Sequence, residues 1–311
     1  MKNLRFGLIG LGYFGKNYLR LLQEIDGIEL VAVAAKTKES LDECSSQIPK
    51  NATRTTDAKA ILKNPSVDAV VIATPPATHA QFSVEALKNG KHALLEKPLA
   101  DSLRNAKKIR DAAKKSKTVF MVGHQYVYND YVKWLHDNIS TLGKISQVAA
   151  EHLYNGPIRQ DIGCLWDAGT HQLSMMQHLL NPGRIVSAKG KLVRMNKKGI
   201  DDFTAATIEF ENGLSATMIL TWLSPQKTRK LTLIGSEKTA VFDDVKENDK
   251  VTITDRHTGK QLAPKIAAKE PLRNEVEHFL HCILTGEKPM TDADSSYEIT
   301  EWLEKISASL D

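Results

Sequence analysis

The sequence has few cysteines, few aromatic residues and no long apolar run. It contains three cysteines, Cys44, Cys164 and Cys282, and 6% of its residues are aromatic. The cysteines lie far apart and form no CxxC pair, so neither a disulfide framework nor a zinc cluster is indicated, and a reducing compartment is favoured. No stretch approaches the roughly 20 apolar residues that a membrane span needs. We therefore expect a soluble, cytoplasmic protein.

The charge of the chain excludes one broad class of partner. Lys and Arg total 42 against 37 Asp and Glu, a formal net charge of +5. This surplus is small and no dense Lys/Arg run accompanies it, so no nucleic acid partner is expected. With 41% hydrophobic and 25% charged residues the composition is that of a globular protein, and 311 residues suggest two domains.

Up to about residue 122, short apolar runs alternate with amphipathic stretches. The runs lack a polar face, as expected of strands buried on both sides of a parallel sheet. The stretches between them carry apolar residues at helical spacing. Strands are predicted at 4–9, 29–34, 68–73, 92–95 and 119–122, and helices at 16–25, 77–89 and 102–115. This alternation predicts an α/β domain at 1–122 with a doubly wound parallel sheet of the Rossmann type.

The pattern changes from about residue 144. Residues 214–222 alternate between apolar and polar or smaller side chains, and Asn212-Gly213 predicts a hairpin with 204–210. Gly235-Ser236 and Thr258-Gly259 predict two more hairpins. Helices are expected at 166–180, 273–285 and 295–309. The second domain, 123–311, is therefore predicted to be α+β with a large, mainly antiparallel sheet, and its last helices could pack back on the first domain.

A glycine-rich motif follows the first predicted strand. It reads Gly10-Leu11-Gly12-Tyr13-Phe14-Gly15, a GxGxxG that opens a predicted helix. The first glycine permits a tight turn, the second lets the backbone approach a pyrophosphate, and the third lets helix pack on strand. The motif predicts dinucleotide binding, with Tyr13 and Phe14 at the start of the helix. The alternative is a tight turn without a ligand.

The end of the second predicted strand bears on the choice of cofactor. An acidic residue there would bind the ribose 2′-hydroxyl of NAD, and a basic one would accept the 2′-phosphate of NADP. The sequence has Ala35 followed by Lys36 and Thr37. We therefore predict NADP, bound through Lys36 and Thr37, with NAD as the alternative. The other interpretation is that Lys36 and Thr37 are solvated turn residues that bind no ligand.

Two groups of residues could carry acid–base chemistry. Glu96-Lys97-Pro98 ends a predicted strand at the carboxyl edge, where doubly wound sheets bind ligands, and Lys97 could exchange a proton with a substrate oxygen. Asp167 and His171 stand four residues apart on a predicted helix, so they share a face. The alternative for Lys97 is an exposed lysine without a catalytic role. The alternatives for Asp167 and His171 are a surface pair or two metal ligands. No convincing third ligand is present, so no metal is predicted.

Taken together, these motifs resemble the Gfo/Idh/MocA oxidoreductases, a family that includes glucose–fructose oxidoreductase and inositol dehydrogenase. The resemblance spans nearly the full length. Its parts, in chain order, are the Gly10–Gly15 loop, Thr74-Pro75-Pro76 with His79, Glu96-Lys97-Pro98, Asp167 with His171 in a D-x-G-x-H pattern, and Glu270-Pro271-Leu272. It implies a Rossmann domain, then an α/β domain whose open sheet joins subunits into a homodimer or homotetramer.

The resemblance also implies roles for single residues. Lys97 and His171 would form the catalytic pair, and Asp167 would orient the sugar hydroxyl and the histidine. The cofactor would be lined by Thr74, Pro75 and His79, and also by Lys97, with Glu96 near the nicotinamide ribose. The implied reaction is hydride transfer between the nicotinamide C4 and a sugar carbon that carries a hydroxyl or a ketone.

Two segments, 155–159 with 165–167 and 222–229, resemble the branch that handles nucleotide-linked amino sugars. A diphosphate would suit the charges of Arg159, Lys227 and Arg229. Tyr154 and Trp166 are assigned to the same substrate site. The acid common after the second strand in that branch is replaced here by Ala35. A free sugar or polyol, another small alcohol, and a non-catalytic NADP-binding redox sensor are the alternatives.

Overall fold

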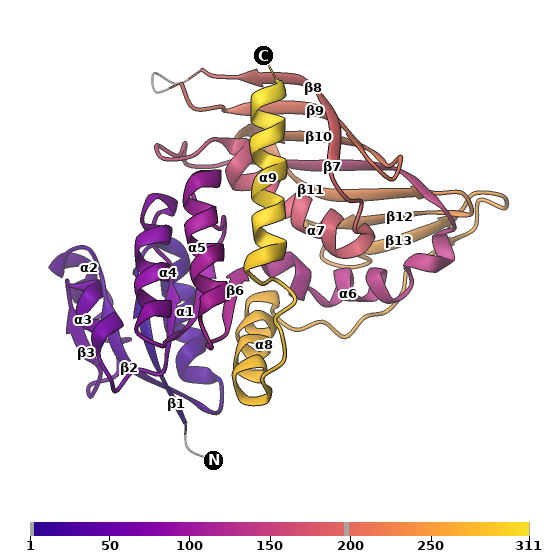
Figure 1. Cartoon of the computed structure of the whole chain (residues 1–311). Helices are drawn as coiled ribbons and strands as arrows, with labels where there is room; N and C mark the ends of the chain where they lie inside the picture. Colours follow the sequence, from indigo (N-terminus) through magenta and orange to yellow (C-terminus); the bar gives the residue numbers. More distant parts are fainter. Residues whose placement is uncertain (1–2, 196–198, 311) are drawn as a thin grey trace. The chain divides into compact units, whose positions relative to one another are not determined.

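The computed structural model describes residues 3–195 and 199–310, and the chain separates into two compact units (Figure 1). The first unit contains the residues up to Gly123 together with Leu272–Tyr297. The second contains His124–Pro271 and the residues from Glu298 onward. Helix α8 (Pro271–Thr285) therefore belongs mostly to the N-terminal unit, although it lies late in the sequence.

The first unit contains a six-stranded parallel sheet with the order β3-β2-β1-β4-β5-β6. This confirms the predicted doubly wound arrangement, because the order reverses direction at β1 and β4. The central strands are mostly apolar, and all four residues of β4 are apolar and buried. The strands are β1 (Leu4–Ile9), β2 (Ile28–Ala34), β3 (Thr53–Thr55), β4 (Ala69–Ile72), β5 (His92–Glu96) and β6 (Phe120–Gly123).

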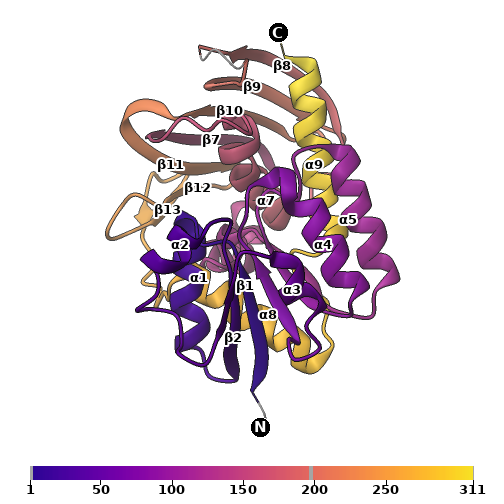
Figure 2. The ribbon, with the colours of Figure 1, turned by 90° about the vertical axis from the view of Figure 1, so that its left-hand side faces the viewer.

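Helices cover both faces of this sheet (Figure 2). One face packs against α3 (Ala58–Lys63), α4 (His79–Lys88) and α5 (Leu103–Lys115) in a single apolar cluster. On the other face Phe279 of α8 makes an edge-to-face contact with Phe6 of β1. The remaining helices are α1 (Tyr13–Glu24) and α2 (Lys38–Glu43). The short elements α2, α3 and β3 were not predicted, because they contain too few residues to show a periodic pattern.

The second unit contains an eight-stranded sheet with the order β14-β13-β12-β11-β7-β10-β9-β8. It is antiparallel apart from the pair β7 and β10, as predicted. The hairpin at Asn212-Gly213 is confirmed: Gly213 has φ of 84°, and the Asn212 side chain accepts from Leu214 N–H. The strands are β7 (Ile145–Asn155), β8 (Ile185–Val193), β9 (Phe203–Phe210), β10 (Ser215–Thr221), β11 (Leu223–Gly235), β12 (Lys238–Asp243), β13 (Val251–Asp255) and β14 (Gln261–Leu262).

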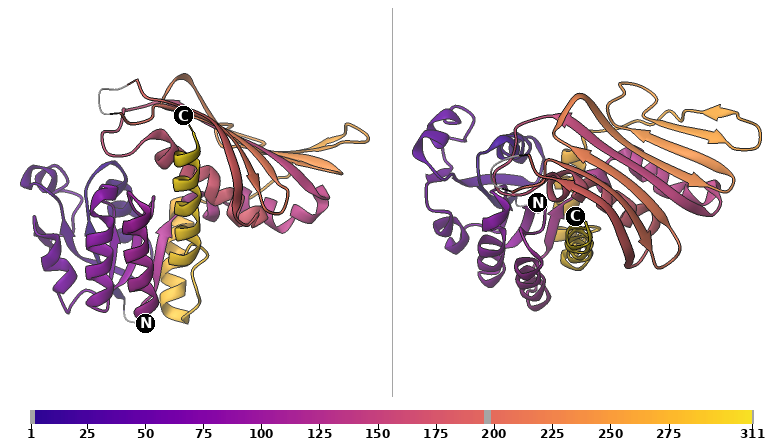
Figure 3. Two further views of the ribbon diagram at one scale, coloured as in Figure 1. Left: turned by 45° about the horizontal axis from the view of Figure 1, so that its top comes forward. Right: turned by 90° about the horizontal axis from the view of Figure 1, so that it is seen from above.

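One face of this sheet is covered by helices, as Figure 3 shows. They are α6 (Asp130–Asp137), α7 (Thr170–Leu180) and α9 (Ala293–Ser309), the last with its residues from Glu298 onward in this unit. The alternating residues of β10 enter the apolar cluster beneath the sheet. The core also contains Trp222, whose indole N–H donates to Asp202 at 2.7 Å. Within the described residues, no helix has both the length and the apolar composition needed to cross a membrane.

The helix predicted at 166–180 begins differently from the prediction. Its first turn, Leu165–Gly169, is a π-helix, and regular α7 starts at Thr170. Two side-chain hydrogen bonds reach the backbone of this turn, one of them from a residue distant in the sequence. The Thr170 hydroxyl donates to the carbonyl of Trp166 at 2.6 Å, and Asp201 accepts from Leu165 N–H at 2.8 Å. Single π turns of this kind occur frequently at functional sites, and this one contains Asp167.

Candidate active site

The turn from β1 into α1 depends on two glycines that touch other backbone. Gly10 has φ of 104°, and a Cβ on it would lie 2.2 Å from the carbonyl oxygen of Ala73. A Cβ on Gly15 would lie 2.1 Å from the carbonyl oxygen of Gly10. Only glycine fits at these positions, which lets the first turn of α1 lie directly against the ends of β1 and β4.

Gly12 is different, because a Cβ placed on it meets nothing within 4 Å. It is the N-cap residue of α1, and no side chain caps the helix there. The first N–H groups of a helix have no partner within the helix and form a binding site for anions. Tyr13 beside it is 86% exposed, and Phe14 packs edge-on against Tyr13. The open side at Gly12 therefore fits the pyrophosphate of a dinucleotide.

The residues predicted to select NADP lie after β2. Ala35 is buried, and Lys36 and Thr37 are exposed. Thr37 is the N-cap of α2, where its hydroxyl oxygen accepts from Ser40 N–H at 3.3 Å. A phosphate at this point would meet the Lys36 charge and the N-terminus of α2. The role of both residues in binding a 2′-phosphate stays a prediction.

His79 joins the loops that follow β4 and β5. One ring nitrogen lies 2.8 Å from the carbonyl oxygen of Thr74 and the other 2.8 Å from that of Pro98. The ring therefore connects the two loops through their backbone carbonyl groups. His79 is fully buried, which gives it a supporting place beneath the loops, while Thr74 and Pro75 lie nearer the surface. A direct contact between His79 and cofactor stays a prediction.

Lys97 follows β5 and precedes a cis peptide bond to Pro98. Its backbone N–H donates to Glu96 Oε2 at 3.0 Å, and Glu96 Oε1 accepts from the Tyr18 hydroxyl at 2.9 Å. Since β1, β4 and β5 are neighbours in the sheet, their carboxyl ends bring together the Gly10–Gly15 loop, the Thr74 loop and Lys97. This is the edge at which open α/β sheets bind ligands.

In the second unit, Asp167 is held by two side chains. Its Oδ2 accepts from the Tyr154 hydroxyl at 3.1 Å, and its Oδ1 lies 3.3 Å from Arg159, which also forms a bidentate pair with Asp161. Burial raises the pKa of Tyr154, and the Asp167 carboxylate raises it further, so the hydroxyl remains a donor. The predicted residues Tyr154, Arg159 and Asp167 are therefore brought together.

His171 lies one turn along α7 in a group of aromatic rings. Its ring stacks on that of His152, with centroids 5.6 Å apart and planes 13° apart, and meets the edge of Tyr126. The Tyr126 hydroxyl donates to Asp244 at 3.0 Å, and Asp244 pairs with Arg229 at 3.7 Å. Arg229 is thus linked to the His171 ring indirectly, through the side chains of Asp244 and Tyr126.

Two predicted substrate residues are placed apart from this group. The indole N–H of Trp166 donates to the Ser307 hydroxyl of α9 at 3.2 Å, so the polar edge of the ring is used within the protein. Lys227 is exposed on β11. Their roles in substrate binding stay predictions.

The sequence interpretation missed several polar residues beside the predicted ones, among them Tyr18, Tyr126, His152, Asp244 and Glu275. Glu275 alone had a clear signal. It stands on the apolar face of its helix with Leu272, Val276 and Phe279, the spacing of buried positions, where an acidic residue is unusual. Tyr18, Tyr126 and His152 lie in runs whose pattern is typical of an ordinary core, and Asp244 lies in a charged segment typical of a surface loop.

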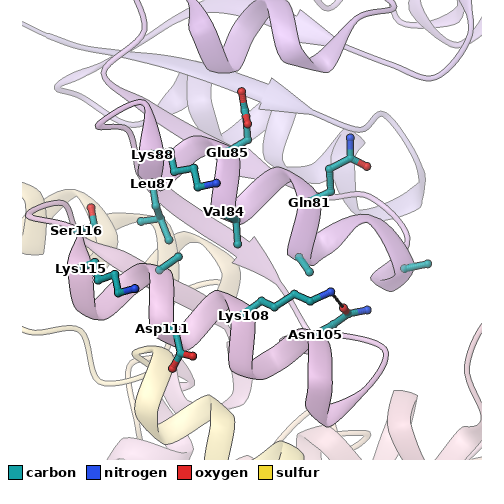
Figure 4. A pocket seen from close by; sticks show the side chains of 13 residues that line it. Gln81, Val84, Glu85, Leu87, Lys88, Asn105, Lys108, Asp111, Lys115 and Ser116 are labelled. Carbon is teal, nitrogen blue, oxygen red and sulfur yellow. Dashed lines mark hydrogen bonds between the residues drawn. The ribbon is translucent and has the colours of Figure 1, made fainter.

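Two further features contribute nothing to this site. Within the described residues, no group of three or more His, Cys, Asp or Glu is arranged to hold a metal ion. A hollow of about 830 Å³ runs along α4 and α5, lined by side chains such as Gln81, Val84 and Lys108, which donates to Asn105 (Figure 4). None of its lining residues is among those predicted for cofactor or substrate.

The different surroundings of Gly12 and Gly15 give opposite expectations for the same substitution. Gly12→Ala should change the unfolding midpoint little, because the new methyl group meets no protein atom. It should weaken NADP binding about tenfold or more, because the methyl group would occupy the space expected for the pyrophosphate. Gly15→Ala should lower the midpoint, because its Cβ meets backbone. Thermal unfolding and a fluorescence titration with NADP measure both effects. Unchanged NADP affinity in Gly12→Ala would show that the loop is only a turn.

Comparisons with known proteins identify the family. Residues 4–124 match the Gfo/Idh/MocA profile described as "Oxidoreductase family, NAD-binding Rossmann fold", and residues 139–241 match the C-terminal domain of the same family. A 4-carboxy-2-hydroxymuconate-6-semialdehyde dehydrogenase of a Sphingobium species is 32% identical over 136 residues, which span 44% of this chain and 43% of that protein. An NAD⁺-dependent scyllo-inositol 2-dehydrogenase of Bacillus subtilis is 23% identical over 95% of this chain and 91% of its own length.

The fold is also that of a solved structure. UDP-N-acetylglucosamine 3-dehydrogenase from Acidithiobacillus ferrooxidans superposes with a TM-score of 0.87 over all of this chain and 98% of that one, at 22% identity, a similarity that establishes the fold alone. Both domains of the family are thus matched in order. The chain belongs to the Gfo/Idh/MocA family of oxidoreductases.

Proposed function

We propose that the protein is an NADP-dependent oxidoreductase that transfers hydride between the nicotinamide C4 and a sugar carbon bearing a hydroxyl or a ketone, on a nucleotide-linked sugar. The observation that carries the proposal is that this chain has Lys97, Asp167 and His171 where the family resemblance places the catalytic residues, together with an open side at Gly12. A protein that only senses the cofactor would have no need of an acid–base set.

The first unit would hold the cofactor. Backbone N–H groups at the start of α1 would bind the pyrophosphate beside Gly12, and Lys36 would neutralise the 2′-phosphate. Thr74 and Pro75 would line the nicotinamide side, with Glu96 near its ribose. When bound, the cofactor supplies the site that accepts or donates the hydride.

The second unit would hold the sugar and take part in proton transfer. Asp167, kept in place by Tyr154 and Arg159, would accept a hydrogen bond from a sugar hydroxyl and orient His171. In oxidation, His171 or Lys97 would take the hydroxyl proton as the hydride leaves the same carbon, which yields a ketone. In reduction the same group would return a proton to the oxygen.

The substrate class rests on the positive charges of the second unit. Arg159 and Lys227, with Arg229, would match a substrate diphosphate. Arg159 already pairs with Asp161 and Asp167, and Arg229 with Asp244, so part of this charge is neutralised by the protein itself. That observation favours a second candidate, a dehydrogenase of a free sugar or polyol. The two candidate functions differ in one measurable respect: only an enzyme for nucleotide-linked sugars should have a kcat/KM that depends on the substrate diphosphate.

Turnover of UDP- and TDP-linked sugars against the matching free sugars, followed by NADPH absorbance, tests this proposal. Lys97→Met should lower kcat by about 100-fold or more, since general acid–base catalysis commonly contributes that much. Lys88→Met, on an exposed part of α4, serves as the control and should keep full activity. If the wild-type protein binds NADP but oxidises no sugar or polyol, the redox-sensor alternative is supported. If Lys97→Met retains the wild-type kcat, Lys97 takes no part in proton transfer.

Lys36 gives the test of cofactor choice. Lys36→Ala should raise the KM for NADP about tenfold, because a hydrogen bond to a charged group contributes about 1.5–3 kcal/mol, and should leave the KM for NAD nearly unchanged. Steady-state kinetics with both cofactors measure the effect. The matched control is Lys38→Ala, two residues along on the same exposed segment. An equal effect on both cofactors, or a wild-type preference for NAD, would contradict the assignment.

We also propose that the uncovered face of the large sheet joins subunits. Small and β-branched residues form a row across five neighbouring strands of that face: Val241, Thr232, Ala149, Thr217 and Thr207 are successive partners. Light scattering should therefore give a dimer or tetramer, and Thr217→Lys should shift it toward the monomer. A wild-type monomer at micromolar concentration would contradict this proposal.

A further inference from the structure

Two carboxyl groups meet at a single hydroxyl in the interior of the first unit. The Tyr18 oxygen lies 2.9 Å from Glu96 Oε1 and 2.8 Å from Glu275 Oε1. The three residues come from α1, β5 and α8, which are distant in the sequence. Tyr18 and Glu275 are fully buried, and Glu96 is 7% exposed. Such a contact between acidic groups away from water requires a specific arrangement of protons.

Counting protons shows that one of the carboxyl groups is neutral. The Tyr18 hydroxyl has one proton and can donate it to only one of the two carboxyl oxygens. If both carboxyls were ionised, the other contact would bring two acceptors together without a proton between them. Both hydrogen bonds form only when one carboxyl group carries a proton and donates it to the Tyr18 oxygen.

The surroundings show which group carries that proton. Glu96 Oε2 accepts from the backbone N–H of Lys97, a bond that favours the carboxylate form of Glu96. Glu275 Oε2 is buried and, within the described residues, has no hydrogen-bond partner. Burial raises the pKa of Glu275 well above its usual value, and the nearby Glu96 raises it further.

The titratable groups that face Glu275 come from two elements, Tyr18 of α1 and Glu96 of β5. The third neighbour is Gly123 at the end of β6, which has no side chain; a Cβ there would lie 3.0 Å from Glu275 Oε1 and 3.1 Å from the Tyr18 oxygen. On α8 itself, Arg273 pairs with Glu24 and Glu277. The glycine thus leaves space for the hydrogen-bonded chain.

We propose that Glu275 is a positioning residue that keeps its proton in the folded protein and, through Tyr18, holds the Glu96 carboxylate against the Lys97 backbone. The hydrogen bonds then have one fixed order: Glu275 donates to Tyr18, Tyr18 donates to Glu96, and Lys97 N–H donates to Glu96. The consequence for catalysis rests on the proposed role of Lys97. The protonation state of Glu275 does not depend on it.

Glu275→Gln tests the protonation state without any substrate. The amide can donate to Tyr18 as the acid does, but it does not titrate. In the unfolded chain Glu275 ionises above about pH 4.5, whereas the folded wild type keeps the proton, so wild-type stability falls as pH rises between these two pKa values. The unfolding midpoint of Glu275→Gln minus that of the wild type should therefore increase by several degrees from about pH 5 to about pH 8.

Glu277→Gln is the matched control, because Glu277 lies on the same helix, is 37% exposed and pairs with Arg273. Its difference from the wild type should stay nearly constant over the same pH range. A constant difference for Glu275→Gln as well would overturn the proposal, since it would mean that Glu275 is ionised in the folded protein. This readout is independent of turnover and remains valid if the proposed sugar chemistry fails.

The positioning role has its own measurement. Glu275→Gln keeps a hydrogen-bond donor to Tyr18 and should keep kcat within about threefold of the wild type. Glu275→Leu removes the donor, so the Tyr18 hydroxyl loses its fixed direction. This variant should lower kcat about tenfold or more, with a smaller change in the KM for the sugar. Rescue by glutamine separates a hydrogen-bonding role from simple packing. Equal kcat in the two variants would limit Glu275 to a structural role, and so would contradict the proposal.

Discussion

The close contact of backbone with backbone at the first turn of α1 is the constraint on which the first unit depends. The carbonyl groups of Ala73 and Gly10 occupy the space where side chains would stand on Gly10 and Gly15. Because α1 is held this near to β1 and β4, its N-terminus opens on the side of Gly12. The same placement brings Tyr18, little more than one turn further along the helix, within reach of Glu96 at the end of β5.

Buried polar groups then fix the loops that carry the chemistry. His79 links the loop after β4 to the one after β5 through two carbonyl groups, and Tyr18 links Glu96 to α8. In the second unit, Asp167 is held by Arg159 and Tyr154 on a π turn. Unsatisfied groups of these kinds would cost about 1–3 kcal/mol each, so each network selects one arrangement of its loop. Rigid placement of this sort is what proton and hydride transfer require.

The sequence predicted the fold well because both units show clear periodic patterns. The buried strands of the first sheet, the Asn212-Gly213 hairpin and the helices at 77–89, 102–115 and 273–285 all follow from local signals. The π turn did not, because it depends on Asp201, a residue about 35 positions away from Leu165 in the chain. The short α2 and α3 were missed because six residues do not show a helical period.

The site was predictable where a motif implies a local geometry, and less so where partners come from distant elements. The Gly10–Gly15 loop is local, and its three glycines have the surroundings expected of them. The link between Tyr18 and Glu275 spans 257 positions, so neither residue alone revealed it. Likewise, the ring contacts of His171 with Tyr126 and His152 arise only when three separate segments of the chain pack together.

Transfer of deuterium tests the central claim, direct hydride exchange between cofactor and sugar carbon, most directly. The protein is incubated with NADPH deuterated at C4 on either face, together with the keto form of a sugar that it turns over, and the product is examined by mass spectrometry and NMR. The account predicts that the label from one face appears on the carbon that carried the ketone. Reduction without label from either face, or label lost to solvent, would contradict it.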